Sequence, residues 1–337
     1  MPTNNEQLVV AVSSRALFDL EMEHRLFEEA GIKAYRKYQT EHKDDPLRPG
    51  VAYPFVRRLL MLNKIYGPES FKVIVISRNS PEIISLTAGQ DRHRYLMGLR
   101  GRQDTGQRFF SSCRYYNLPI KAGAFTSGQS TFPYLSAYGA SLFLSANKEN
   151  VIRAIHQGQP AGLVLPTDLS QQEADSENEL RIAFDFDGVI VDDESEKTYK
   201  KEGLAGFERF EQRLKTTPHS PGPLHQLFKK LARFQELDEK LGQGNPYYKP
   251  NIRVAIVTAR GAPSEQRLIT TLRSFGMRAA ELFLLDGMSK AGVLEAFRPH
   301  IFFDDQIRHL EGTKQIVPSV LIPFGVRNGQ DTLVVNK

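Results

Sequence analysis

The C-terminal half of the chain alternates short apolar runs with longer segments of helical spacing. Five runs of four to six residues are mostly apolar, without the strict alternation of a strand that has one exposed face. Strands buried on both faces have this pattern, so it predicts a parallel β-sheet with helices on both faces. The runs are 181–184 (RIAF), 253–257 (RVAIV), 280–285 (AELFLL), 300–303 (HIFF) and 319–322 (SVLI).

The pattern turns helical after the first of these strands. Residues 199–214 and 224–241 carry apolar side chains at every third or fourth position, which is typical of helices with one buried face. The stretch TTPHSPGP between them indicates a loop. We therefore expect a small helical cap insert over about 193–250, between the first and second strands of this half.

The N-terminal half repeats the same order of elements. Residues 9–24 (VVAVSSRALFDLEMEH) align without a gap on residues 181–196 (RIAFDFDGVIVDDESE). At the same offset Gly31 falls on Gly203, and such a fixed offset is typical of an internal repeat. Further pairs in the same order are Pro49-Gly50 with Pro221-Gly222, 73–79 with 254–260, 141–147 with 300–306, and 160–166 with 317–323.

A polar, acidic stretch separates the two halves. Residues 167–180 (TDLSQQEADSENEL) have almost no large apolar side chains, as expected of a linker. We therefore predict an α/β protein built of two Rossmann-like halves, related by an apparent internal duplication. The N-terminal domain would cover residues 1–166 and the C-terminal domain residues 181–337.

Composition excludes several classes of protein. The 337 residues are 40% hydrophobic and 25% charged, which is ordinary for a globular chain and argues against disorder. No apolar run approaches the roughly 18 residues of a membrane span, and the first residues lack the pattern of a signal peptide. A single cysteine, Cys113, excludes an internal disulfide and a cysteine-based metal site. We expect a cytoplasmic protein with no membrane partner, and a homo-oligomer remains open.

The formal net charge of +5 indicates either a solvated, slightly basic surface or a partner that carries phosphate, which would be a small ester or a nucleic acid. Basic and aromatic residues cluster only in residues 92–110 (RHRYLMGLRGRQDTGQRFF). Short basic loops are more often solvated or bind small anions, so no nucleic acid is expected. A nucleic-acid binder would depend on Arg92, Arg94, Arg100 and Arg102.

Chemically active side chains follow three of the predicted strands in the C-terminal half. They are Asp185 and Asp187 after the first strand, Thr258, Ala259 and Arg260 after the second, and Asp304 and Asp305 after the fourth, with Lys290 at the start of a predicted helix. Each alone could be a turn, a helix cap or a solvated side chain. Ligands bind at the carboxyl ends of strands in open α/β sheets, so the ordered set indicates one site.

The residue types suit phosphoryl transfer with a hard cation. Clustered carboxylates repel one another, and Mg²⁺, which prefers oxygen ligands, would supply the counter-charge. Asp185 could attack phosphorus and form an aspartyl-phosphate, and Asp187 could protonate the leaving alkoxide and later deprotonate water. The hydroxyl of Thr258 could hold phosphoryl oxygens, and Lys290 could offset negative charge. Gly188 would let the chain turn sharply beside the site.

These stretches resemble the four motifs of the haloacid dehalogenase superfamily of phosphotransferases. The matching residues are DFDGV (185–189), VTAR (257–260), Lys290 and FFDDQ (302–306). The resemblance implies a haloacid dehalogenase-like fold for both halves, with the catalytic site in the C-terminal one. It also implies that Mg²⁺ contacts Asp185, the backbone carbonyl of Asp187, and Asp305, with Asp304 as a partner.

A closer resemblance runs from about residue 8 to residue 326. The stretches AVSSRALF (11–18), LFLSAN (142–147), DDESE (192–196) and RPHIFFDDQ (298–306) are similar to the cytosolic 5'-nucleotidase type I family, the AMP-preferring nucleotidases. This resemblance implies Mg²⁺-dependent hydrolysis of a nucleoside 5'-monophosphate to nucleoside and phosphate. Residues 89–108 look longer and more basic than in the animal members, which bears on nucleotide preference.

The N-terminal half lacks the acids of the site. Ser13, Arg15 and Ser145-Ala146 stand at the equivalent positions, so this half is predicted neither to bind Mg²⁺ nor to form an acyl phosphate. The family resemblance points to residues 77–79 and 125–130 as substrate-binding loops, although Ser and Gly there are also typical of turns. The candidate substrate-binding residues are Ser77, Asn79, Ser127, Gly128, Thr258, Ala259 and Arg260.

Two other functions compete with a nucleotidase. One is a phosphatase of the same type that acts on another small phosphate ester, and the other is a non-catalytic nucleotide-binding protein. The presence of every acid in the C-terminal site favours an enzyme. His309 is expected to lie on a helix surface rather than to act as a ligand.

Overall fold

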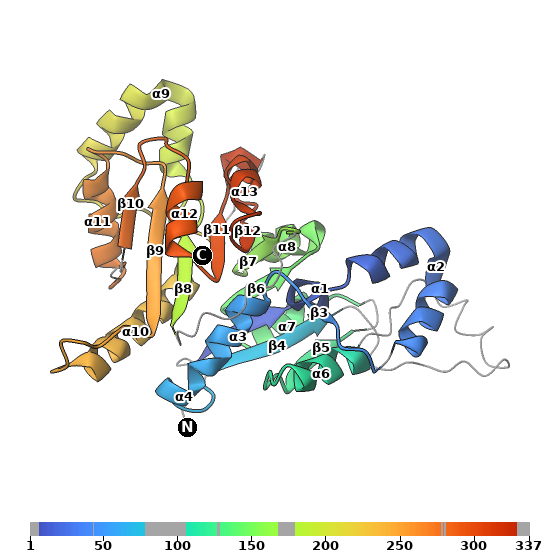
Figure 1. The fold of residues 1–337 in the computed structure, drawn as a ribbon. Coiled ribbons are helices and arrows are strands. Elements are labelled where there is room, and N and C mark those ends of the chain that lie inside the picture. Colours follow the sequence, from blue (N-terminus) through green and yellow to red (C-terminus); the bar gives the residue numbers. More distant parts are fainter. Residues whose placement is uncertain are drawn as a thin grey trace.

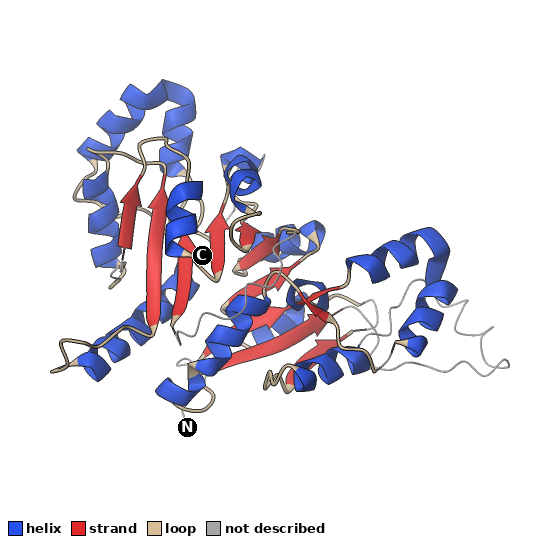
Figure 2. Ribbon diagram, in the orientation of Figure 1, coloured by secondary structure: helices blue, strands red, loops and turns tan. Residues whose placement is uncertain are grey.

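The computed structural model describes residues 7–42, 44–77, 106–126, 129–167, 179–277, 279 and 281–328. Ten strands form one continuous sheet in the order β10-β9-β8-β11-β12-β7-β6-β1-β4-β5, and Figure 2 shows them as one layer flanked by helices. The strands are β1 (Leu8–Val12), β4 (Phe71–Ser77), β5 (Ala122–Phe125), β6 (Leu142–Ser145), β7 (Ala161–Val164), β8 (Leu180–Phe184), β9 (Ile252–Thr258), β10 (Glu281–Leu284), β11 (Ile301–Asp304) and β12 (Ser319–Leu321).

Each half of the chain contributes five strands with the same order. The N-terminal half runs β5-β4-β1-β6-β7 and the C-terminal half β10-β9-β8-β11-β12, with parallel pairing throughout each half. The two halves meet where β7 pairs antiparallel with β12, with Val164 opposite Val320. The strands of the N-terminal half therefore run antiparallel to those of the C-terminal half. The predicted α/β class is confirmed, and the halves share one sheet.

Twelve helices lie in the described residues. They are α1 (Ser14–Leu17), α2 (Glu21–Glu41), α3 (Tyr53–Met61), α4 (Asn63–Tyr66), α6 (Gly106–Tyr115), α7 (Phe132–Ala137), α8 (Lys148–His156), α9 (Glu194–Arg213), α10 (His225–Gly242), α11 (Glu265–Ser274), α12 (Ala291–Phe297) and α13 (Ile307–Thr313). A 3-10 turn, Val326–Asn328, follows, and a small ladder pairs β2 (Phe18–Asp19) with β3 (Arg48–Pro49). No helix in these ranges is long and apolar enough to cross a bilayer.

The two helices of the predicted insert have different positions. Figure 1 shows α9 beyond the carboxyl ends of β9 and β10, whereas α10 lies near the amino end of β9. The apolar face of α10 is buried in the main core through residues such as Leu227, Phe228 and Leu231, so this helix belongs to the layer that covers the sheet. Only α9 stands where it could cover a ligand at the strand ends.

A buried carboxylate ties the two halves together on the α10 side. Asp238 accepts hydrogen bonds from the hydroxyl of Tyr66 in the N-terminal half and from the hydroxyl of Tyr248, both at 2.7 Å. The backbone amide of Asn251 donates to its other oxygen at 2.6 Å. One apolar cluster also runs from β1 of the first half to β8 and β9 of the second. The halves are therefore joined by packing and by polar contacts as well as by the sheet.

Candidate active site

Three predicted site residues meet at the carboxyl ends of β8 and β11. Asp185 follows β8, Asp304 ends β11, and Lys290 directly precedes α12. The ammonium of Lys290 lies 2.9 Å from Oδ2 of Asp185 and 2.7 Å from Oδ2 of Asp304. All three side chains are at least 95% buried, so the lysine neutralises carboxylates that water hardly reaches.

Burial and charge set the protonation of these groups. Burial raises the pKa of Asp185 to about 6, and Lys290 opposes that rise. Burial alone would also raise the pKa of Asp304, but the charge of Lys290 and the contact with His309 outweigh it, so the net change is a lowering. Burial would lower the pKa of Lys290, yet the two carboxylates raise it to about 12. The lysine therefore stays charged at neutral pH.

Backbone and side-chain donors fix the two carboxylates in place. Oδ1 of Asp185 accepts from the amide of Phe186 at 2.7 Å, and Oδ1 of Asp304 accepts from the amide of Gln306 at 2.7 Å. Nδ1 of His309, one turn into α13, lies 3.2 Å from both oxygens of Asp304. His309 was expected to lie on a helix surface rather than to act as a ligand. Its ring is 19% exposed, and the first turn of α13 brings it back onto the carboxylate that ends β11.

Asp305 has a buried oxygen without a partner. Its side chain is almost wholly buried, and no group among the described residues hydrogen-bonds to Oδ1. Burial, together with the charges of Asp304 and Asp185, raises its pKa well above the usual range. Gly188 faces this carboxylate with φ +69, and a Cβ there would lie 2.6 Å from Oδ2 of Asp305. The tight approach therefore requires glycine at this turn.

The donor set fits a hard cation. Asp185, Asp304 and His309 each offer one ligand atom, and these atoms lie within 4.8 Å of one another. Asp305, next in the chain after Asp304, adds a buried carboxylate whose Oδ1 has no hydrogen-bond partner among the described residues. Oxygen-rich sites of this kind suit Mg²⁺, whereas the softer metals favour sulfur and nitrogen.

The stretch VTAR (257–260) spans the end of β9 and places Arg260 beside Asp187. Thr258 ends β9 and is buried, and its hydroxyl accepts from the amide of Arg260 at 3.2 Å. The guanidinium of Arg260 donates to both oxygens of Asp187, from Nε at 2.7 Å and from Nη2 at 2.6 Å. Arg260 was predicted to bind substrate, but in the structure it pairs with the predicted acid/base.

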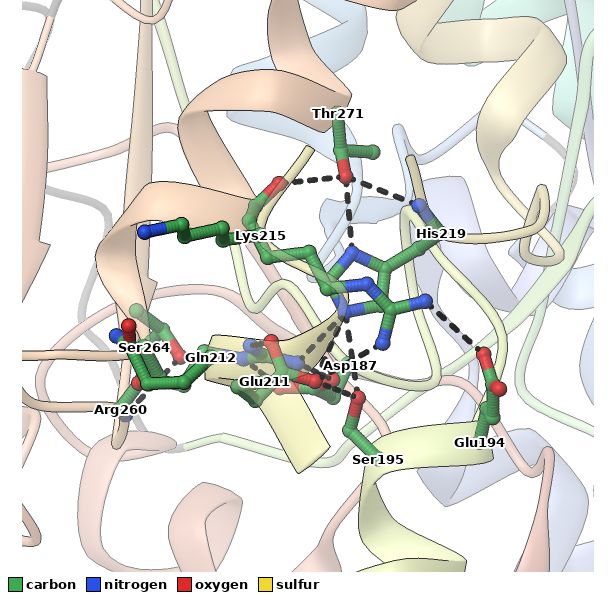
Figure 3. A network of polar contacts seen from close by, with 12 residues as sticks. Asp187, Glu194, Ser195, Glu211, Gln212, Lys215, His219, Arg260, Ser264 and Thr271 are labelled. Carbon is green, nitrogen blue, oxygen red and sulfur yellow. Dashed lines mark hydrogen bonds and ion pairs between the residues drawn. The ribbon is translucent and has the colours of Figure 1, made fainter. Parts of the chain in front are cut away.

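A buried polar network extends from this pair into α9, as Figure 3 shows. Nη1 of Arg260 donates to Glu211 at 2.5 Å, and Glu211 also accepts from Ser195 Oγ at 2.7 Å and from Arg267 Nη1 at 3.1 Å. His219 completes it, with Nδ1 2.9 Å from the hydroxyl of Thr271. Sequence reasoning missed Glu211 and His219, because each stands in a segment that reads as a surface helix or a loop.

The N-terminal half carries ordinary structural contacts at the equivalent positions. The hydroxyl of Ser13 caps α1 by accepting from the amide of Ala16, and the hydroxyl of Ser145 accepts from the amide of Asn147. Arg15 pairs with Glu21 at 2.6 Å. Within the described ranges, the group of acids and histidine that could hold a metal lies in the C-terminal half alone.

The predicted substrate-binding loops of the N-terminal half are only partly described. Ser77 ends β4 and is buried, and its carbonyl accepts from the amide of Thr126 at 2.9 Å. Asn79, Ser127 and Gly128 lie outside the described residues, as do residues 92–105 of the basic segment. Within that segment Arg108 is buried and pairs with Glu23 at 2.9 Å, so it is unavailable to nucleic acid.

Known proteins match this chain over nearly its whole length. The family model described as 5'-nucleotidase matches residues 1–96 and 96–329. The chain is 30% identical over 322 residues to a human protein, "Cytosolic 5'-nucleotidase 1B", and this match covers 94% of the chain and 48% of that relative. The chain thus spans about half the length of the curated relative that it matches.

Proposed function

Because the chain belongs to the 5'-nucleotidase family, we propose that its C-terminal half hydrolyses nucleoside 5'-monophosphates, AMP-like ones preferred, to nucleoside and phosphate. The reaction would be Mg²⁺-dependent and would pass through an aspartyl-phosphate. The observation that carries the proposal is the buried cluster of Asp185, Lys290 and Asp304, beside the unpaired oxygen of Asp305. So many buried acids are costly unless the site binds a cation, and a cation held there would attract the phosphoryl group of a substrate.

In the proposed first step, a carboxylate oxygen of Asp185 attacks phosphorus and the bond from phosphorus to the ribose oxygen breaks. Protonated Asp187 gives its proton to the leaving alkoxide. The fixed hydrogen bond from the amide of Phe186 and the contact with Lys290 orient Asp185 for this attack. The hydroxyl of Thr258 and the charge of Lys290 stabilise negative charge on the phosphoryl oxygens.

In the second step, water attacks the aspartyl-phosphate. Asp187 takes a proton from the water, the new bond from oxygen to phosphorus forms, and the bond from phosphorus to Asp185 breaks. Inorganic phosphate leaves, and Asp187 holds the proton for the next cycle. Mg²⁺, held by Asp185, Asp304 or Asp305 and the carbonyl of Asp187, would supply charge stabilisation for the phosphoryl oxygens.

The N-terminal half is proposed to be a duplicated copy of the fold without the chemistry. The shared strand order and the matching glycine positions support a common origin. Its pairing of Ser13 and Arg15 with local groups supports a structural role, with substrate contacts coming from the loops that follow β4 and β5.

A phosphate-release assay over a panel of nucleoside 5'-monophosphates, with and without Mg²⁺, tests the proposal. We expect release from AMP or dAMP to rank highest and to be lost when Mg²⁺ is chelated. A panel in which sugar phosphates rank above all nucleotides would support the other phosphatase. Nucleotide binding without any turnover would support a non-catalytic binding protein.

A further inference from the structure

The acid/base carboxylate of the proposed reaction is held by one arginine. Arg260 donates to both oxygens of Asp187, from Nε at 2.7 Å and from Nη2 at 2.6 Å. A guanidinium that engages a carboxylate through two parallel donors fixes its orientation as well as its charge. The side chain of Arg260 is buried, whereas that of Asp187 remains 17% exposed, so solvent reaches the ion pair from the side of Asp187.

The arginine is in turn held by α9. Its remaining terminal nitrogen, Nη1, donates to Glu211 at 2.5 Å, and Nη2 also lies 3.1 Å from Nε2 of His219. The guanidinium lies 5.2 Å from the ring centres of both Phe186 and Phe207. Every nitrogen of the side chain therefore has a protein partner.

Glu211 is itself completely buried and held by several partners. Ser195 Oγ at 2.7 Å and Arg267 Nη1 at 3.1 Å both donate to its Oε1. Ser195 and Glu211 belong to α9, which stands beyond the strand ends, whereas Arg267 belongs to α11 of the core layer. The network thus connects the one insert helix near the site to the acid/base carboxylate (Figure 3).

We propose that Arg260 is a positioning residue that holds the carboxyl group of Asp187 in one orientation, and that Glu211 of α9 fixes Arg260 for this task. The inference rests on the proposed function. It replaces the sequence-based prediction that Arg260 binds substrate. A bidentate guanidinium fixes the orientation of its partner, and a base that takes a proton from water must be held in the right orientation toward that water.

The step that depends most on Arg260 is therefore breakdown of the aspartyl-phosphate. There Asp187 takes a proton from water while oxygen bonds to phosphorus and the bond to Asp185 breaks. Formation of the aspartyl-phosphate from a substrate with a good leaving group needs no proton from Asp187. Loss of Arg260 should consequently slow breakdown far more than formation when the substrate is p-nitrophenyl phosphate.

The test uses rapid mixing of the full-length enzyme with p-nitrophenyl phosphate and Mg²⁺. Arg260→Lys keeps the positive charge but removes the two parallel N–H donors to Asp187. Glu211→Gln keeps the size of the side chain that holds Arg260 but removes its negative charge. Arg213→Lys is the matched control, because Arg213 is exposed on the same helix as Glu211, with its guanidinium 5.5 Å from the ring centre of Phe210. Circular dichroism and thermal unfolding establish that each variant is folded.

We expect Arg260→Lys to release about one equivalent of nitrophenol in a burst at close to the wild-type rate, with steady-state turnover lower by about tenfold or more. The KM should change little. Glu211→Gln should also show a burst and a lower steady-state turnover, with a smaller loss of turnover than Arg260→Lys. If Arg260→Lys does not fold, the kinetics of Glu211→Gln test the proposal. Arg213→Lys should match wild type.

A clear rise in KM and in the inhibition constant of inorganic phosphate, without a burst, would mean that Arg260 contacts the phosphoryl group and would overturn the inference. Unchanged kinetics in both variants would also overturn it. Failure of the wild-type enzyme to release phosphate from any nucleoside monophosphate would contradict the proposed function instead, so the two failures are distinguishable.

Discussion

Gly31 and Gly203 break their helices with nearly the same backbone conformation. Gly31 has φ 74 and ψ −179 inside α2, and Gly203 has φ 71 and ψ −171 inside α9. Residues with a side chain rarely adopt this conformation. The first long helix of each half, α2 and α9, is therefore bent at the same place by the same residue type, and in the C-terminal half the bend shapes the helix that holds Glu211.

Replacing either glycine by alanine should destabilise the protein by about 1–3 kcal/mol, because the backbone conformation is strained for alanine. No atom lies within 4 Å of a Cβ at either position, so the loss would report backbone strain alone. Urea unfolding measures it. Gly312→Ala, in α13 with equally open space and an ordinary φ, is the control and should be neutral or slightly stabilising. Equal stability in all three variants would rule out strain at the bends.

Lys290→Met should lower the free energy of unfolding by about 3–5 kcal/mol in the absence of Mg²⁺, because it leaves the buried carboxylates of Asp185 and Asp304 without their cation. Chemical denaturation measures the loss. Lys240→Met on the exposed face of α10 is the control and should cost little. Adding Asp304→Asn to Lys290→Met should recover part of the stability, and a further loss would contradict the charge argument.

Asp238→Asn should destabilise the protein by about 2–3 kcal/mol, because an amide cannot accept from all the donors that converge on this carboxylate. Phosphate release should be unaffected at temperatures where the variant is folded, since Asp238 belongs to α10, which lies near the amino end of β9 and away from the carboxyl ends of the strands. Glu236→Gln, exposed on the same helix, is the control. A large loss of activity in folded Asp238→Asn would show that the joint between the halves bears on catalysis.

Stability should depend on Glu211 in a predictable pH window. Burial would raise the pKa of Glu211, but its contacts with His219 and Arg260 lower it well below the usual range. The unfolded state therefore binds the proton first, so the stabilisation is complete above the unfolded pKa of about 4.3 and falls as the pH falls below it. The difference in unfolding free energy between wild type and Glu211→Gln should shrink by about 1 kcal/mol from about pH 6 to about pH 3.5. A difference that stays constant would mean that Glu211 is not ionised in the fold.

Much of the architecture could be predicted from local patterns. The apolar runs predicted the strands of the C-terminal half because strands buried on both faces leave an unbroken signal. The fixed offset between Gly31 and Gly203 indicated an internal repeat, but the bend at these glycines was found only in the structure. The antiparallel joint of β7 and β12 could not be predicted, because pairing between two sheet edges depends on contacts far apart in sequence.

In the site, too, local sequence signals could be read, whereas contacts between residues far apart in sequence could not. Asp185, Lys290 and Asp304 could be placed together because each stands at a strand end or a helix start, where topology alone brings them close. The partners of Arg260 could not be predicted. Glu211 lies in a helix whose charged residues mostly face solvent, and only its burial against Arg260, Arg267 and Ser195 shows that it belongs to the site.

Trapping the phosphorylated enzyme tests most directly whether Asp185 is the nucleophile. Wild-type enzyme with Mg²⁺ and a nucleoside monophosphate labelled in its phosphate is quenched in acid within one turnover, digested and mapped by mass spectrometry. We predict label on the peptide that contains Asp185, and neither label nor phosphate release in folded Asp185→Asn. Label on another residue, or turnover retained in Asp185→Asn, would contradict the proposed mechanism.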